Sequence, residues 1–137
     1  MTAPVHLNIA PSYEQLELIP AALEEFAERD NWPPDLVFKM NLVLEELGVN
    51  IVNYSGATGD IEISLASDAE RVTVEISDDG RPFNPLLDQE TPDVSAPLGD
   101  RPIGGLGIHL VRTMMDEMWY SRENGKNKLA MTKRKSE

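Results

Sequence analysis

Apolar and polar residues alternate in three short runs, and this alternation predicts strands. Residues 5–9 form the first run, with apolar side chains at the odd positions, and the same period of two recurs at residues 61–65 and 72–76. A period of two places every apolar side chain on one face, so each run predicts a strand with one buried face. A short polar link at residues 67–70 joins the last two runs and predicts an antiparallel hairpin.

A helical pattern follows the first strand. It opens at Pro11-Ser12 and extends to about Asp30, and Ser12 and Gln15 have the spacing of a capping box. Pro20 lies inside this stretch, so we expect either a kink there or the start of the regular helix.

A second helix is expected from Pro34 to about Tyr54, because proline suits the first turn of a helix and the apolar residues recur at helical spacing. These residues form two stripes on different sides, which predicts that the helix packs between the sheet and a neighbouring helix. The first stripe contains Leu36, Met40, Val43, Leu47 and Ile51, and the second contains Phe38, Leu42, Val49 and Val52.

The stretch at residues 79–103 contains five prolines and has no sustained period. A structureless connection of this length in a compact domain is usually functional, so we predict a lid at about residues 84–103. The glycine-rich segment after it leads into a helix that should end near Met118. Strands at residues 119–122 and 127–133 then close the chain as a hairpin.

The order of these elements predicts an α+β fold in a single domain of residues 1–137. Alternation in every strand favours antiparallel pairing, and the helices are available to cover the apolar faces of the strands. We therefore expect a two-layer sandwich in which about three helices cover one face of a mostly antiparallel, mixed sheet.

Composition narrows the classes of function. The 137 residues include 24 Asp and Glu against 12 Lys and Arg, and no cysteine. The lack of cysteine excludes disulfides, thiolate metal sites and cysteine nucleophiles. A net charge of −12 argues against binding to nucleic acid or to an anionic membrane. No apolar run approaches the ~20 residues that span a bilayer, and the chain starts without a signal-like segment, so we expect a cytoplasmic protein.

The acidic excess is greatest in residues 1–60, where ten acidic residues face only Arg29 and Lys39. This excess predicts either a soluble acidic surface or a docking face for a basic partner. Because cationic side chains are scarce, a polyphosphate would have to bind through backbone N–H groups, helix ends and a metal.

Glu46 and Asn50 lie one helical turn apart, in the sector between the two apolar stripes. Polar side chains at the edge of a buried surface need partners. Either the two are satisfied by hydrogen bonds within the protein, or Asn50 offers an oxygen to Mg²⁺ and Glu46 acts as a base.

Two further segments have both a plain and a functional interpretation. Asp78-Asp79-Gly80-Arg81-Pro82-Phe83 follows a predicted strand and is either a turn or a site where a carboxylate accepts a hydrogen bond from an amine such as that of adenine. In the second case Gly80 lets a flat ring approach the backbone. Gly104-Gly105-Leu106-Gly107 precedes a helix and is either a hinge or an anion site made of N–H groups.

These segments, together with Glu46-Leu47-Gly48-Val49-Asn50, resemble the N, G1 and G2 boxes of the GHKL superfamily, which binds ATP in the Bergerat fold. The resemblance covers nearly the whole chain. It is closest to the small anti-sigma-factor serine/threonine kinases of bacteria, whose histidine-kinase-like ATPase domain stands alone.

The resemblance implies a role for each matching residue. Glu46 corresponds to the general base, Asn50 to the ligand of a Mg²⁺ that bridges the ATP phosphates, and Asp78 to the residue that recognises the adenine amine. The acceptor is then a serine of an anti-anti-sigma (STAS-type) protein, a sigma factor is the second partner, and a homodimer is expected. The implied nucleotide-binding residues are Asn50, Asp78, Gly80, Phe83, Gly104, Gly105, Leu106 and Gly107.

Two departures from the family pattern leave an alternative open. Gly48-Val49 stands where many relatives have a small polar pair, and Ile103 stands where some have a basic residue. The alternative is an ATP-gated binding module with little or no kinase activity. The catalytic half of a histidine kinase fits worse, because neither His6 nor His109 lies in a predicted dimerising hairpin of helices.

Overall fold

The computed structural model describes residues 2–86 and 105–136, with the side chains of residues 105–108 left out. In chain order the elements are β1 (Val5–Ile9), α1 (Tyr13–Leu16), α2 (Leu18–Arg29), α3 (Pro34–Asn50), the π-helical turn η1 (Ile51–Ser55), β2 (Ile61–Ser67), β3 (Arg71–Asp78), α4 (Gly105–Met114), β4 (Glu117–Glu123) and β5 (Lys126–Arg134).

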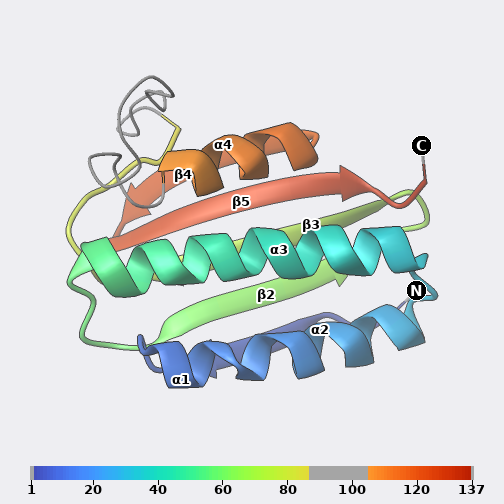
Figure 1. The fold of residues 1–137 in the computed structure, drawn as a ribbon, viewed down its shortest axis with the longest axis horizontal. Helices are drawn as coiled ribbons and strands as arrows, with labels where there is room; N and C mark the ends of the chain where they lie inside the picture. Colours follow the sequence, from blue (N-terminus) through green and yellow to red (C-terminus); the bar gives the residue numbers. More distant parts are fainter. Residues whose placement is uncertain (1, 87–104, 137) are drawn as a thin grey trace.

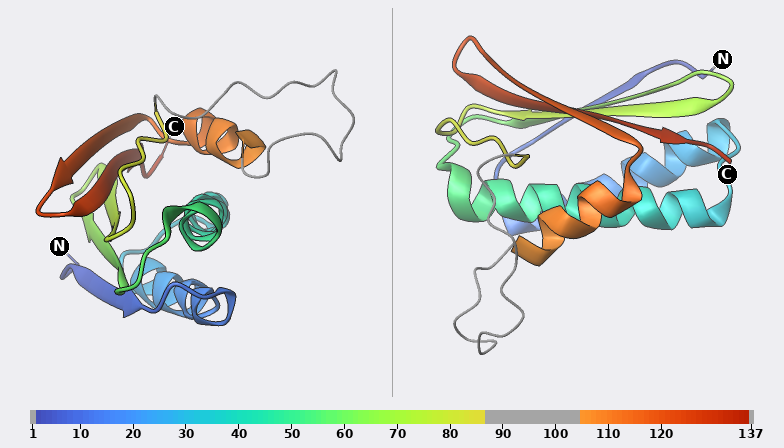
Figure 2. Two further views of the ribbon diagram at one scale, coloured as in Figure 1. Left: turned by 90° about the vertical axis from the view of Figure 1, so that its left-hand side faces the viewer. Right: turned by 90° about the horizontal axis from the view of Figure 1, so that it is seen from above.

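The five strands form one sheet in the order β1-β2-β3-β5-β4, and the helices cover one of its faces (Figure 1). The sheet curves around the helical layer, where α3 lies between α2 and α4 (Figure 2). Every strand pair of this sheet is antiparallel. The predicted α+β sandwich is therefore confirmed.

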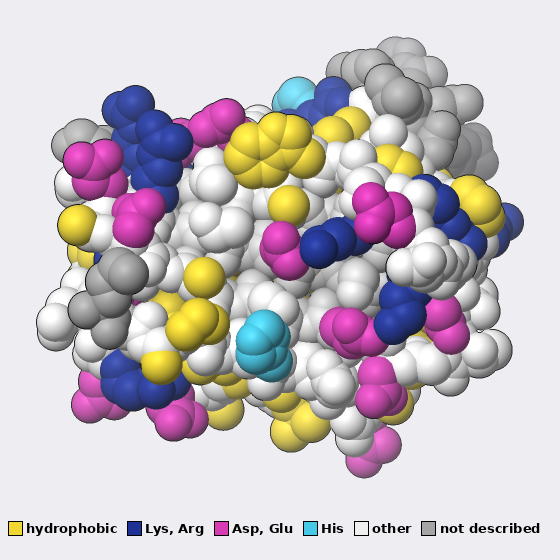
Figure 3. Space-filling model, turned by 180° about the vertical axis from the view of Figure 1, so that it is seen from behind, with side chains coloured by type: hydrophobic (Ala, Val, Ile, Leu, Met, Phe, Trp, Pro, Cys, Tyr) yellow, Lys and Arg dark blue, Asp and Glu magenta, His cyan; other side chains and the backbone are white. Residues whose placement is uncertain are grey.

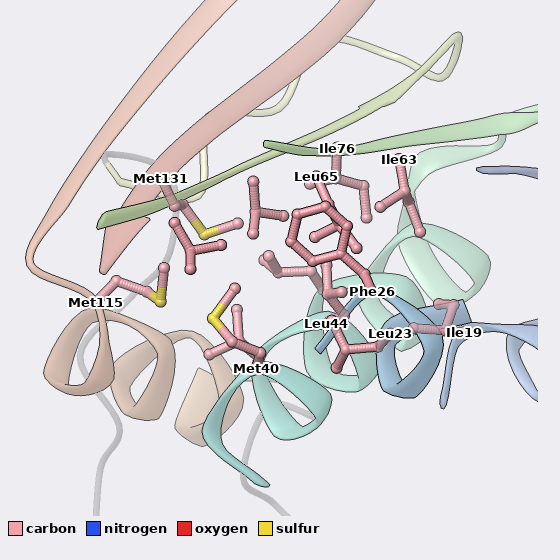
Figure 4. Packing of buried hydrophobic residues seen from close by; sticks show 14 of the residues in the cluster. Ile19, Leu23, Phe26, Met40, Leu44, Ile63, Leu65, Ile76, Met115 and Met131 are labelled. Carbon is pink, nitrogen blue, oxygen red and sulfur yellow. The ribbon is translucent and has the colours of Figure 1, made fainter. Parts of the chain in front are cut away.

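The core fills the space between the sheet and the helices. Strand positions that point inward, such as Ile63, Leu65 and Ile76, meet the buried side chains of α2 and α3. At the other end of the core lie Met40 of α3, Met131 of β5, and Met115, which directly follows α4 (Figure 4). Methionine adapts to irregular gaps, which suits the place where α4 joins the helical layer.

The opposite face of the sheet carries acidic and basic side chains in alternation (Figure 3). Lys126 pairs with Glu62 at 2.5 Å, and Lys128 pairs with Glu75 at 3.2 Å. This polar face explains the alternation that the sequence shows.

The helix starts agree with the sequence. The side chain of Ser12 accepts a hydrogen bond from the backbone N–H of Gln15 at 3.2 Å, as a cap should. The break between α1 and α2 falls at Glu17. Pro20 has no N–H to donate to the carbonyl of Leu16, so the regular helix is interrupted before the proline.

The predicted second stripe on α3 is not buried as expected. Phe38 is 65% exposed, and Leu42, Val49 and Val52 are only half-buried. The helices form a single layer, and α1 packs beside α3, where a β-carbon on Gly48 would lie 2.7 Å from a methyl group of Leu16. In the described residues no element covers the outer side of α3.

The predicted end of the last helix near Met118 is wrong, because α4 ends at Met114 and Met118 lies in β4. The backbone N–H of Asp116 donates to the carbonyl of Thr132 at 3.0 Å, and its carboxylate accepts from the N–H of Arg134 at 2.7 Å. These bonds to β5 start the strand where the helical pattern would continue.

Asn124 and Gly125 form the tight turn between β4 and β5, and both have positive φ angles, 53° and 75°. Such a two-residue turn fixes which residues face each other. It places Glu123 opposite Lys126, and in the neighbouring strand pair Asn127 of β5 lies opposite Asp78 of β3.

Among the described helices, none has the length and apolar character that crossing a membrane requires.

Candidate functional site

A pocket lies where α3 ends and where β3 leaves the sheet. Its cavity has a volume of about 50 Å³ and is partly open to solvent. The π-helical turn η1 forms part of its wall, and such turns are frequent at functional sites. Its lining residues are Leu47, Asn50, Ile51, Tyr54, Ser55, Ile76, Asp78, Phe83, Pro85, Tyr120, Asn127 and Leu129.

The structure brings three predicted site residues together here, since Asn50, Asp78 and Phe83 all line this pocket. Glu46 is half-buried on α3, one turn before Asn50, and is not among the lining residues.

The predicted glycine segment is described only in part. Gly105, Leu106 and Gly107 form the start of α4, which satisfies the expectation of glycines at a helix start. The predicted lid at about residues 84–103 is described only at residues 84–86, and Gly104 lies outside the described residues.

Asn50 is 8% exposed, and its Nδ2 atom has no hydrogen-bond partner among the described residues. An unpaired buried amide N–H group costs about 1–3 kcal/mol of stability. The two ends of a carboxamide exchange by a half-turn of the side chain, so its oxygen can take the unpaired position.

The unpaired position of the Asn50 amide fits a magnesium ion, because Mg²⁺ prefers hard ligands and an amide oxygen is one. No cluster of three or more His, Asp or Glu able to hold a metal occurs in the part of the chain that the structure describes. A Mg²⁺ at Asn50 would therefore take most of its ligands from phosphate and water, as Mg²⁺ commonly does.

Asp78 is buried at the end of β3, with 6% of its surface exposed. The backbone N–H of Gly80 donates to its Oδ1 at 2.9 Å, and Nδ2 of Asn127 donates to the same atom at 3.3 Å. Since both bonds end on Oδ1, Oδ2 can accept a hydrogen bond from a group in the pocket.

Gly80 is buried against the end of the helix. A β-carbon at this position would lie 2.4 Å from the carbonyl oxygen of Ser55, and the N–H of Arg81 donates to that same oxygen at 2.8 Å. The structure thus gives a packing reason for this glycine, beside its predicted place against a ring.

The chain after β3 is held by side chains from several elements. Arg122 of β4 donates to the carbonyl of Gly80 at 2.7 Å, and Arg112 of α4 donates to the carbonyl of Leu86. The wall of the pocket is therefore tied both to the sheet and to the helix that follows the predicted lid.

Asp79 fastens a second loop to this wall. Its carboxylate accepts hydrogen bonds from the N–H groups of Thr58 at 3.0 Å and Gly59 at 2.9 Å. Partial desolvation raises the pKa of Asp79, but these backbone hydrogen bonds outweigh it and the pKa falls below its ordinary value.

Sequence reasoning missed Asn127, Tyr120 and Arg122. Asn127 occupies an inward position of β5, two residues before the buried Leu129. A polar residue in the inward phase of a strand was the available signal, because a buried amide needs partners.

A model of the histidine kinase-like ATPase domain family matches residues 9–133. The serine/threonine-protein kinase BtrW of Bordetella bronchiseptica is 32% identical over 113 residues, which is 80% of this chain and 79% of BtrW. The serine-protein kinase RsbW of Bacillus cereus is 28% identical over 134 residues, which is 94% of this chain and 83% of RsbW.

Solved structures share the fold. The RsbU and RsbW domains of Rv1364c from Mycobacterium tuberculosis give a TM-score of 0.71 at 14% identity, covering 97% of this chain and 32% of that chain. This chain thus spans about a third of that longer one. The SiaB-SiaC complex from Pseudomonas aeruginosa gives a TM-score of 0.60 at 14% identity, covering 95% of this chain and 89% of that chain.

Proposed function

This chain belongs to the histidine kinase-like ATPase domain family, and from that premise we propose that it is an ATP-dependent serine/threonine protein kinase of the anti-sigma-factor type. One observation carries the proposal beyond family membership: Asn50 and Asp78 line a single pocket, and the amide of Asn50 is buried there with an unpaired atom. Its relatives BtrW and RsbW are kinases that act on serine or threonine.

Each residue has a distinct task in this proposal. Asp78 accepts a hydrogen bond from the adenine amine, and the glycines at the start of α4 face the phosphates. Asn50 holds Mg²⁺, which when bound supplies charge compensation to the phosphates. Glu46 takes the proton of the acceptor hydroxyl as its oxygen attacks the γ-phosphorus, and ADP leaves.

The acceptor in the proposal is a serine of an anti-anti-sigma (STAS-type) protein, and a sigma factor is the partner that the kinase sequesters. A homodimer inside the cell completes the proposal. The similarity to the two kinases supports this choice. The acidic excess in residues 1–60 also supports it, because negative charge favours binding to a basic protein surface.

The test is transfer of label from MgATP to an anti-anti-sigma protein. Glu46→Gln should abolish transfer and keep ATP binding, because the residue lies one turn from the pocket. The control is Glu24→Gln, at an exposed residue of α2 that lines none of the described pockets, and it should transfer label at the normal rate. Equal activity in both variants would exclude Glu46 as the base.

A second candidate function is a nucleotide-gated binding module, and a groove between α1–α2 and α3 favours it. Its floor is apolar, its rim carries two carboxylates, and the Oδ1 atom of Asn41 is buried there without a hydrogen-bond partner among the described residues. The lining residues are Tyr13, Leu16, Glu17, Ile19, Pro20, Asn41, Glu45 and Val49.

A basic amphipathic segment of a protein partner fits this groove by charge. Tight ATP binding without transfer to any acceptor, together with a sigma-factor affinity that Glu17→Lys lowers, would favour the module over the kinase. Transfer at an ordinary rate would favour the kinase.

A further inference from the structure

The side chain of Asn127 uses its whole hydrogen-bonding capacity. Its Oδ1 accepts from the backbone N–H of Phe83 at 3.1 Å and from the hydroxyl of Tyr120 at 2.5 Å. Its Nδ2 donates to the carbonyl of Arg81 at 2.8 Å and to Oδ1 of Asp78 at 3.3 Å. A carboxamide offers two donor hydrogens and two acceptor positions, so all four are occupied.

The backbone partners fix the orientation of this amide. A half-turn of the side chain would place NH₂ against the N–H of Phe83 and oxygen against the carbonyl of Arg81, losing both bonds. Asn127 is also 6% exposed, so water does not replace its partners readily. Its Nδ2 therefore points at Asp78 in one fixed sense.

We propose that Asn127 is a positioning residue that sets the base selectivity of the nucleotide pocket by holding the carboxylate of Asp78, an inference that rests on the proposed nucleotide-binding function. Having no free donor or acceptor, Asn127 acts through Asp78 and not on the nucleotide. It occupies Oδ1 of Asp78 together with the N–H of Gly80 and leaves Oδ2 as an acceptor.

A carboxylate oxygen held in this way discriminates between purines. Oδ2 accepts a hydrogen bond from a 6-amino group, whereas a 6-oxo group presents a second acceptor and leaves Oδ2 without a donor. The same amide holds Arg81 and Phe83, so the carboxylate and the pocket wall keep one relative position. The pocket should thus select adenine over hypoxanthine.

The experiment compares the dissociation constants of ATP and inosine triphosphate, both with Mg²⁺, on the full chain. Wild type should bind ATP more tightly than inosine triphosphate. Asn127→Ala should lower the ratio of the dissociation constant of inosine triphosphate to that of ATP at least about tenfold, chiefly by weakening the binding of ATP. Tyr120→Phe removes one of the four bonds and should lower the ratio less. Lys128→Ala, on the solvent side of the same strand, should leave it unchanged.

Several results of this experiment would overturn the inference. If Asn127→Ala weakens both nucleotides equally, the residue is merely structural and the inference is overturned. If that variant does not fold, an unchanged ratio in Tyr120→Phe overturns the inference. A wild type that binds both nucleotides equally overturns the inference alone, whereas one that binds neither overturns the proposed function as well.

Discussion

The α-carbon of Gly80 lies against the carbonyl of Ser55, so close that a β-carbon on Gly80 would be 2.4 Å from that oxygen. This contact joins the end of β3 to the turn that ends α3, and the two elements carry Asp78 and Asn50 into the same pocket. The distance between these two predicted nucleotide-binding residues thus depends on the lack of a side chain at residue 80.

Gly80→Ala should therefore lower the free energy of unfolding by about 1–3 kcal/mol, because backbone must move to relieve the overlap. ATP binding should weaken in the same variant, since the movement separates the two sides of the pocket. Urea unfolding and a nucleotide titration measure the two effects.

Gly125→Ala provides the matched control. Gly125 has a φ of 75° and nothing within 4 Å of the added carbon, so alanine should cost about 1–2 kcal/mol through backbone strain alone. ATP binding should remain at the wild-type level. If the two alanines affect binding alike, the contact with Ser55 does not shape the pocket.

Asn50→Leu should separate stability from function. Removing an unpaired buried amide should raise the free energy of unfolding of the ligand-free protein by about 1 kcal/mol. The gain in thermal stability that MgATP gives the wild type should disappear. A differential scanning fluorimetry series with and without MgATP tests both parts, and a destabilised variant that still responds to MgATP contradicts the assignment.

Asp78→Asn should weaken ATP roughly 10-fold to 100-fold, because an amide that turns its NH₂ toward the adenine amine loses a charge-assisted hydrogen bond. Inorganic triphosphate, which has no base, should be affected little. Asp79→Asn is the control, since that carboxylate binds the loop at Thr58 and Gly59. Equal weakening of ATP and triphosphate would remove Asp78 from base recognition.

Asp30, which does not line the pocket, should make the stability of the protein depend on pH. Burial of its carboxyl opposes ionisation, but hydrogen bonds from Thr2, Lys135 and Trp32 outweigh it and lower the pKa from 3.8 to about 2. Folding therefore favours the ionised form, and the ionised carboxylate of Asp30 contributes about 2 kcal/mol to the free energy of unfolding. This stability is present above pH 4 and is lost as the pH falls from about 4 towards 2.

Asp30→Asn should remove that dependence and lower the free energy of unfolding at pH 7. Asp35→Asn is the control, because Asp35 is 75% exposed and pairs with Lys39 one turn away on the helix surface. Such exposed pairs contribute about 0.3–0.5 kcal/mol. Urea unfolding between pH 2 and pH 7 compares the two variants, and a parallel loss in wild type and Asp30→Asn contradicts the assignment.

The local pattern of the sequence was enough to predict most of the fold. Period-two alternation identified β1, β2 and β3, the last two strands were predicted as a closing hairpin, and Pro20 and Pro34 located the breaks and starts of helices. The pattern was ambiguous where apolar residues satisfy both periods, as at Met114 and Met118, and there the hydrogen bonds of Asp116 to β5 decide that a strand begins.

The site was predictable to the extent that its residues have individual signals. Asn50 and Asp78 were found as polar residues at the edge of predicted buried elements, and the structure places them together. Asn127 was missed because its role depends on the backbone of Arg81 and Phe83, which reaches it only in three dimensions. The burial of the second stripe on α3, which includes Phe38, was predicted wrongly because periodicity indicates an apolar face but not what covers it.

The two-residue turn at Asn124 and Gly125 gives the exposed tip of the last hairpin an unexpected constraint. One residue inserted or deleted there would shift the edge strand β4 by one position against β5 and turn its alternating side chains over, because β5 is held in place by β3. Asn127 would then lose the hydroxyl of Tyr120, and the carbonyl of Gly80 would lose Arg122. Length variation at this tip should therefore disturb the pocket although neither turn residue lines it.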